Sequence, residues 1–132
     1  MQRKAYAIGC AEADFSYVVM GQDGISRPDV CWVDVESANS WDEVDLNLNR
    51  FAMQGLFDQL TGHGCTVGVY ASFKEWRQIT GSWRPSAVSG DWVSNAVPLE
   101  ACGRRGFTGA PVWLVQELAT WPDVPVDSDW AC

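Results

Sequence analysis

Two acidic residues at the end of a short apolar run are the side chains of this sequence best placed for chemistry. Asp34 and Glu36 close the segment 30–36, whose apolar residues predict a buried strand. Side chains two residues apart on a strand point to the same face, and their α-carbons lie roughly 6.6 Å apart. Two neighbouring carboxyl groups repel each other, which raises the pKa of one of them and suits it to act as a general acid.

Hydrolysis of a glycosidic bond requires such a pair of carboxyl groups. One group protonates the leaving oxygen, and the other acts at the sugar carbon. The alternative interpretation of Asp34 and Glu36 is that both are strand-end residues facing solvent.

The order of the predicted elements indicates an α/β fold. Strands alternate with helices and are apolar on both faces, a pattern that predicts a parallel sheet. In such a sheet the catalytic and binding residues lie at the carboxyl ends of the strands. We expect the tail 122–132 to be a loop. The expected strands are 30–36, 66–70, 91–94 and 111–116, and the expected helices are 10–20, one from a capping box at Ser40 and Glu43 to Gly62, and 73–79.

The charge balance excludes two classes of partner. The net charge is −8 and the pI is near 4.4, so the chain repels phosphate backbones and gains nothing from an anionic membrane surface. We therefore expect no nucleic-acid partner and no membrane partner. Residues 1–10 lack the apolar run of a signal peptide, so an extracellular or cell-wall location would require a signal outside this chain.

The five cysteines predict disulfides rather than a metal site. None forms a CxxC pair and the chain has one histidine, His63, so we expect no metal and no other cofactor. Cys102 and Cys132 bracket the last segment, where a disulfide would hold the chain end and imply an oxidising compartment. The count is odd, and the pairing of the other cysteines stays open.

Eight tryptophans are many for a chain of 132 residues. Trp rings pack in cores and also stack on sugars, bases or partner proteins. Trp83, Trp92 and Trp121 fit either role, as packing residues or as sugar-stacking residues at the rim of a site.

Several of these segments, in this order, resemble the family 25 lysozymes and their actinobacterial glycoside-hydrolase-like relatives. The resemblance extends over nearly the whole chain. Its motifs are WVDVE at 32–36 with Asn39-Ser40-Trp41, then VGVYAS at 67–72 with Trp76 and ITG at 79–81, and finally WLVQ at 113–116 with Val126-Asp127.

This resemblance implies one domain, residues 1–132, that is a partial (β/α)8 TIM barrel lacking its N-terminal part: roughly the C-terminal half to two-thirds of the barrel. It also implies cleavage of the β-1,4 bond between N-acetylmuramic acid and N-acetylglucosamine in peptidoglycan. Glu36 matches the family's proton donor, Asp34 its supporting acid and Asp127 a further acid, with Asp129 close by. The substrate-binding positions that it implies are Tyr70, Trp113, Gln116 and Trp41; Tyr70 and Trp113 fit equally well as core aromatics.

The chain departs from the family in two ways. Residues 1–9 hold no acid where the family's first strand carries an aspartate, and Glu117 stands where an aromatic is usual. A complete barrel needs about 200 residues. Three explanations stay open: a truncated reading frame, a half-barrel completed by another copy or another protein, or a decayed domain kept for binding. We therefore expect a peptidoglycan-like glycan partner, and either a homo-oligomer that completes the barrel or an unstable monomer. An inactive glycan-binding or interaction module is the alternative function.

Overall fold

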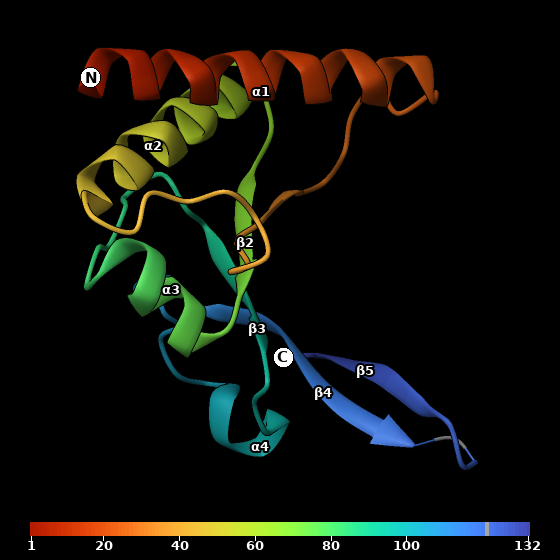
Figure 1. Ribbon diagram of the computed structural model, residues 1–132. Coiled ribbons are helices and arrows are strands. Elements are labelled where there is room, and N and C mark those ends of the chain that lie inside the picture. Colours follow the sequence, from red (N-terminus) through yellow and green to blue (C-terminus); the bar gives the residue numbers. More distant parts are fainter. Residues whose placement is uncertain (121) are drawn as a thin grey trace.

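The computed structural model describes residues 1–120 and 122–132, and Trp121, one of the three tryptophans of undecided role, lies outside this described part. Helices and strands alternate along most of the chain (Figure 1). The elements are α1 (Gln2–Gln22), β1 (Cys31–Asp34), α2 (Leu46–Gly62), β2 (Val67–Ala71), α3 (Phe73–Thr80), β3 (Gly90–Ser94), α4 (Pro98–Ala101), β4 (Val112–Thr120) and β5 (Pro125–Ala131).

The five strands form one sheet in the order β1-β2-β3-β4-β5. The first four strands are parallel, and β5 runs antiparallel to β4. The predicted α/β architecture with a mainly parallel sheet is therefore confirmed. Within the described residues β1 and β5 are the edges, so the sheet is open.

The predicted loop at 122–132 is wrong, because β5 occupies most of it. The strand pairs with β4 from Thr120 opposite Pro125 to Leu114 opposite Ala131. Most of its side chains are exposed, so it lacks the apolar pattern by which a buried strand is recognised. Main-chain hydrogen bonds to β4 hold it, and the hairpin extends away from the helices in Figure 1.

The predicted capping box at Ser40 and Glu43 is also wrong. The cap of α2 is Asp45, whose side chain accepts a hydrogen bond from the Asn47 nitrogen at 3.0 Å. The preceding loop is held by Asp42, which accepts from the nitrogens of Val44 and Asp45. These local bonds begin the helix later than the Ser40 pattern predicts, because short polar side chains bind whichever main-chain donors lie nearest.

One face of the sheet is buried. Val33, Val69, Val93 and Val115 each expose 9% or less of their surface. They form one cluster with Phe57 and other apolar side chains of α2 and α3, which lie on the same side of the strands in Figure 1. Burial of this face supplies the main apolar stabilisation of the fold.

Two disulfides close the chain onto itself. Cys102 pairs with Cys132, as predicted, and holds the end of β5 to the residue that follows α4. Cys31 pairs with Cys65, which joins the start of β1 to the segment before β2. Cys10 is a free thiol on α1. None of the described helices is long and apolar enough to cross a membrane.

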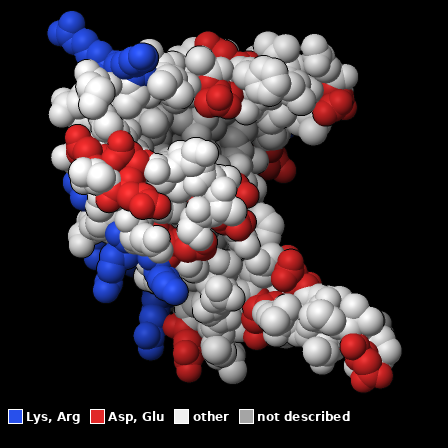
Figure 2. Space-filling view, in the orientation of Figure 1, with Lys and Arg blue, Asp and Glu red and all other residues white. Residues whose placement is uncertain are grey.

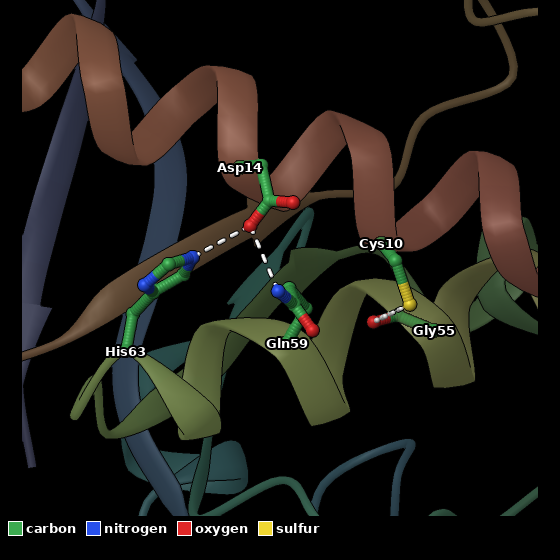
Figure 3. A network of polar contacts seen from close by, with 5 residues as sticks. All are labelled: Cys10, Asp14, Gly55, Gln59 and His63. Atoms are coloured by element: carbon green, nitrogen blue, oxygen red, sulfur yellow. Dashed lines mark hydrogen bonds and ion pairs between the residues drawn. The ribbon is translucent and has the colours of Figure 1, made fainter.

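Two glycines let α1 lie directly on α2. A β-carbon on Gly9 would overlap the main chain of Ala52, and one on Gly55 would overlap the main chain of Tyr6. The same close approach allows the Cys10 thiol to donate to the Gly55 carbonyl at 3.4 Å (Figure 3). Side chains at these two positions would force the helices apart.

A polar contact closes the other end of this helix pair (Figure 3). The Asp14 carboxylate on α1 accepts from Gln59 at 2.9 Å and lies 2.7 Å from the His63 ring nitrogen at the end of α2. The hydrogen bond with His63, followed by that with Gln59, lowers the pKa of Asp14. Tyr17 stacks on the His63 ring with centroids 4.1 Å apart, so His63 packs between the helices.

A buried carboxyl group anchors the loop before β4. Asp91 on β3 is fully buried and accepts from the Thr108 nitrogen at 2.9 Å and the Thr108 hydroxyl at 2.7 Å. Burial raises the pKa of Asp91 from 3.8 to about 7, although both hydrogen bonds from Thr108 act in the opposite direction. Gly106 packs so closely that a β-carbon there would overlap the carboxyl group.

The helix contact predicts that Gly9→Ala destabilises the protein. Its new methyl group would lie 2.8 Å from the Leu56 nitrogen, so the free energy of unfolding should fall by about 1–3 kcal/mol in urea titrations followed by circular dichroism. The matched control is Gly21→Ala on the same helix, where the added carbon meets nothing within 4 Å. That variant should be as stable as the parent or up to about 1 kcal/mol more stable. A Gly9→Ala protein as stable as the parent would contradict the proposed close packing.

Asp91 predicts a stability that declines with rising pH. Between its ordinary pKa of 3.8 and its folded value of about 7, the folded protein holds a proton that the unfolded chain has lost. Stability should therefore fall as pH rises through this window, by up to about 1.4 kcal/mol per pH unit, and then level off. Asp91→Asn should lack this pH dependence, because an amide does not titrate in this range. The variant should still fold, because its amide group can donate to the Thr108 hydroxyl. If the free energy of unfolding depended on pH identically in both proteins, the predicted contribution of Asp91 would be disproved.

Candidate functional site

A pocket of about 320 Å³ opens at the carboxyl ends of the parallel strands. Its walls come from the segment after β1, from the ends of β2 and β3, from the middle of β4, and from α3. The lining residues are Glu36, Ser37, Tyr70, Ser72, Lys74, Glu75, Gln78, Ser94, Asn95 and Gln116. Three of the residues predicted for the site, Glu36, Tyr70 and Gln116, thus meet in one pocket.

Strand register explains why Tyr70 and Gln116 converge. Tyr70 lies opposite Trp92 on β3, and Ser94, two residues later, lies opposite Gln116 on β4. The side chains at these positions point away from the buried valine face. The Tyr70 hydroxyl donates to the Gln116 side-chain oxygen at 2.6 Å. Burial raises the pKa of Tyr70, so the hydroxyl stays neutral and available as a donor.

Glu36 lies just beyond β1, next to Asp34 at the end of the strand. Burial of the Glu36 carboxyl is the largest cause that raises its pKa, followed by the charge and hydrogen bonding of Asp34 and then by the charge of Glu75. The repulsion expected from the spacing of the two acids is therefore present, and burial adds more. A carboxyl group in this setting keeps its proton to higher pH than a free side chain and can donate it.

Hydrogen bonds hold the main chain around Glu36 in place. The Trp41 ring nitrogen donates to the Glu36 carbonyl at 2.7 Å, and the main-chain nitrogen of Asn39 donates to the same oxygen at 3.1 Å. On the other side, the Ser37 nitrogen donates to Glu75 at 3.0 Å. Trp41 was predicted to bind substrate; among the described residues it is not part of the pocket wall, and its ring holds the Glu36 backbone.

Asp127 and Asp129 lie on β5, across the sheet from Glu36. Asp127 is exposed opposite Leu118, and its negative charge helps to raise the pKa of Tyr70. Asp129 accepts from the Trp92 ring nitrogen at 2.9 Å. Neither residue belongs to the set of described side chains that line the pocket.

An aromatic surface continues from the pocket along the open face of the sheet. Trp32 contacts Trp92 and Trp113 edge to face, with ring centroids 5.6 and 6.3 Å apart. Two glycines make room for these rings. A β-carbon on Gly68 would overlap the Trp32 ring, and one on Gly90 would overlap the Trp113 ring. These three tryptophans are only partly buried, so their rings are accessible to a ligand.

Two of the tryptophans with two possible roles, Trp83 and Trp92, have different surroundings in the structure. Trp83 stacks between Trp76 and Phe57, at centroid distances of 5.9 and 6.0 Å, and is therefore a packing residue. Trp92 lies on the open face, beside Tyr70 at 5.1 Å. Trp92 therefore lies where a sugar can stack, whereas Trp83 packs against the hydrophobic core.

Sequence reasoning missed the pocket residues contributed by α3 and by the loops. Ser72 and Glu75 form a capping box: the Ser72 hydroxyl accepts from the Glu75 nitrogen and donates to its carboxylate. That spacing was visible in the sequence, but it marks a helix start and no site. Ser37, Ser94 and Asn95 left no comparable signal. Among the described residues, no group of three or more His, Cys, Asp or Glu side chains is arranged to hold a metal.

The surface is mainly acidic. Figure 2 shows Asp and Glu side chains in several separate patches on the visible face, with Lys and Arg gathered at one end of α1 and around α3. Such a surface repels a nucleic-acid backbone. The charge distribution therefore favours a ligand that carries little phosphate.

Residues 5–94 match the protein-family model described as Lysozyme-like protein 1. The matched segment includes Asp34, Glu36, Tyr70 and Glu75. No curated protein and no solved structure matches the chain.

Proposed function

The chain belongs to the Lysozyme-like protein 1 family, and on this premise we propose that it hydrolyses the β-1,4 bond between N-acetylmuramic acid and N-acetylglucosamine in peptidoglycan. The observation that carries the proposal is the Glu36 carboxyl at the pocket wall, whose pKa is raised by burial and by Asp34. A glycosidase needs a carboxyl group that is still protonated when the substrate binds, since the leaving oxygen must receive a proton.

In this proposal each residue has one role. Glu36 donates its proton to the glycosidic oxygen. The Asp34 carboxylate stabilises the positive charge that develops at the sugar carbon, or steadies an intermediate formed by the sugar's own acetamido group. Tyr70 and Gln116, already joined by a hydrogen bond, bind the sugar, and Asp127 adds negative charge near Tyr70.

Trp113 and Trp41 act around this centre. Trp113 offers its ring on the open face of the sheet, where a sugar can stack. Trp41 supports binding indirectly, since it fixes the Glu36 carbonyl.

We further propose that the sheet is the C-terminal part of a (β/α)8 barrel of the family 25 type. Its support is the run of four parallel strands with helices on one face and a pocket at the carboxyl ends. The two disulfides support an extracellular or cell-wall location.

An inactive glycan-binding module is the second candidate function. The observation that favours it is the open aromatic face of Trp32, Trp92 and Trp113, which offers stacking surface whether or not Glu36 acts. In this case binding to peptidoglycan would occur without cleavage.

The decisive variant is Glu36→Gln, assayed by release of reducing ends from purified peptidoglycan. Loss of the acid should lower the rate by about 10²–10⁴-fold, because that is the usual contribution of a general acid. The matched control is Glu100→Gln, an exposed residue on α4, which should keep the parent rate. Equal rates for the parent and Glu36→Gln would remove Glu36 from the mechanism. No release by the parent, with co-sedimentation retained in both proteins, would identify the binding module.

A second copy that completes the barrel stays a prediction. A cleft of about 810 Å³ is bounded by α1, α2 and the edge strand β1, and its walls include Ile8, Met20 and Leu56. An open strand edge beside apolar surface promotes association. Light scattering across a concentration series should show a dimer that Ile8→Glu weakens. A monomer at every concentration would contradict this prediction.

A further inference from the structure

Glu75 connects α3 to the segment that carries Glu36. It lies in the first turn of α3 and uses both carboxylate oxygens. One oxygen accepts from the Ser37 nitrogen at 3.0 Å and the Ser37 hydroxyl at 2.9 Å, and the other accepts from the Ser72 hydroxyl at 3.0 Å. The contact with Ser37 spans 38 residues of sequence, so it is a tertiary contact rather than part of a helix cap.

We propose that Glu75 is a positioning residue for Glu36: it fixes the main chain that presents the Glu36 carboxyl and keeps a permanent negative charge beside it. The proposal rests on the proposed function, in which Glu36 is the acid.

The positioning follows from where the bonds fall. The Ser37 nitrogen belongs to the peptide that directly follows Glu36, and the carbonyl of that same peptide accepts from Trp41 at 2.7 Å. A peptide held at both its nitrogen and its oxygen cannot rotate without breaking a charge-assisted hydrogen bond. The direction in which Glu36 projects is therefore fixed by Glu75 and Trp41 together.

The charge follows from the same bonds. Hydrogen bonds, that from the Ser37 main chain first, lower the pKa of Glu75, so this group stays ionised. The pKa of Glu36 is raised by burial, by Asp34 and by the charge of Glu75. The surroundings of these two neighbouring carboxyl groups thus shift their pKa values in opposite directions. One group can therefore act as the acid while the other remains an anion.

Other charged or titratable groups also face Glu36. Asp34 on β1 acts in the same direction as Glu75, and the charge of Glu36 in turn raises the pKa of Tyr70 on β2. Lys74 on α3 lines the same pocket, and it is not among the groups that shift the pKa of Glu36. The pocket residues from β3 and β4 are uncharged, so Asp34 and Glu75 are the charged groups that raise the pKa of Glu36.

The test is a carbon-13 titration of the Glu36 carboxyl in the parent, Glu75→Gln, Ser37→Ala and the control Glu100→Gln. Gln keeps an oxygen that can accept from Ser37 and removes only the charge, so the Glu36 midpoint should move down in Glu75→Gln. Ser37→Ala keeps the charge and the main-chain bond, and its midpoint should stay close to the parent value. A midpoint unchanged in folded Glu75→Gln would overturn the proposal.

Hydrolysis gives a second measurement. The alkaline limb of kcat in Glu75→Gln should move to lower pH, because Glu36 loses its proton earlier, while KM changes little. At neutral pH kcat should fall by about tenfold, less than the loss caused by removing the acid itself. A pH profile identical to the parent profile would overturn the proposal.

Two controls keep the result independent of folding and of activity. In the parent protein Glu75 itself should titrate below Glu36, and the reverse order would overturn the proposal without any variant. If the parent hydrolyses no peptidoglycan, the proposed function fails, whereas the carboxyl titrations still decide the role of Glu75.

Discussion

Burial of one face of the sheet organises both the hydrophobic core and the candidate site of this protein. Val33, Val69, Val93 and Val115 occupy that face on four neighbouring strands. Since side chains alternate along a strand, the residues between the valines must face the other side. That side carries the tryptophan rings and, at the carboxyl ends of the strands, the polar groups of the pocket. The same packing that stabilises the fold therefore orients the candidate site.

Carboxyl groups in this protein show that a raised pKa does not by itself mark a site. Asp91 and Glu36 both have a raised pKa with burial as the main cause. Asp91 faces the packed side of the sheet and both of its oxygens bind Thr108, so it serves the fold. Glu36 lines an open pocket beside Asp34 and Glu75, where a ligand can reach it. Access and neighbouring charges, rather than the shift alone, separate the two.

Much of the fold could be predicted because its information is local. The strands at 66–70 and 91–94 and the helix at 73–79 agree with β2, β3 and α3 to within a residue, since β-branched runs and helical spacing are read directly from the chain. The strand β5 was missed because it is held by main-chain bonds to β4 and shows no apolar pattern. The start of α2 was misplaced because the polar bonds of Asp42 and Asp45 compete with the pattern at Ser40.

The apolar pattern along the chain is enough to predict that Asp34 and Glu36 end a buried strand and that a tyrosine and a glutamine end later strands. Which of these residues meet depends on how the strands pair. Parallel pairing puts Asp34 opposite Tyr70, which brings the ends of successive strands, and the helix start that follows β2, to one edge of the sheet. Glu75 reaches Ser37 for that reason. Strand pairing is a non-local property, so no spacing along the chain could place Glu75 beside Glu36 or separate Trp92 from Trp83.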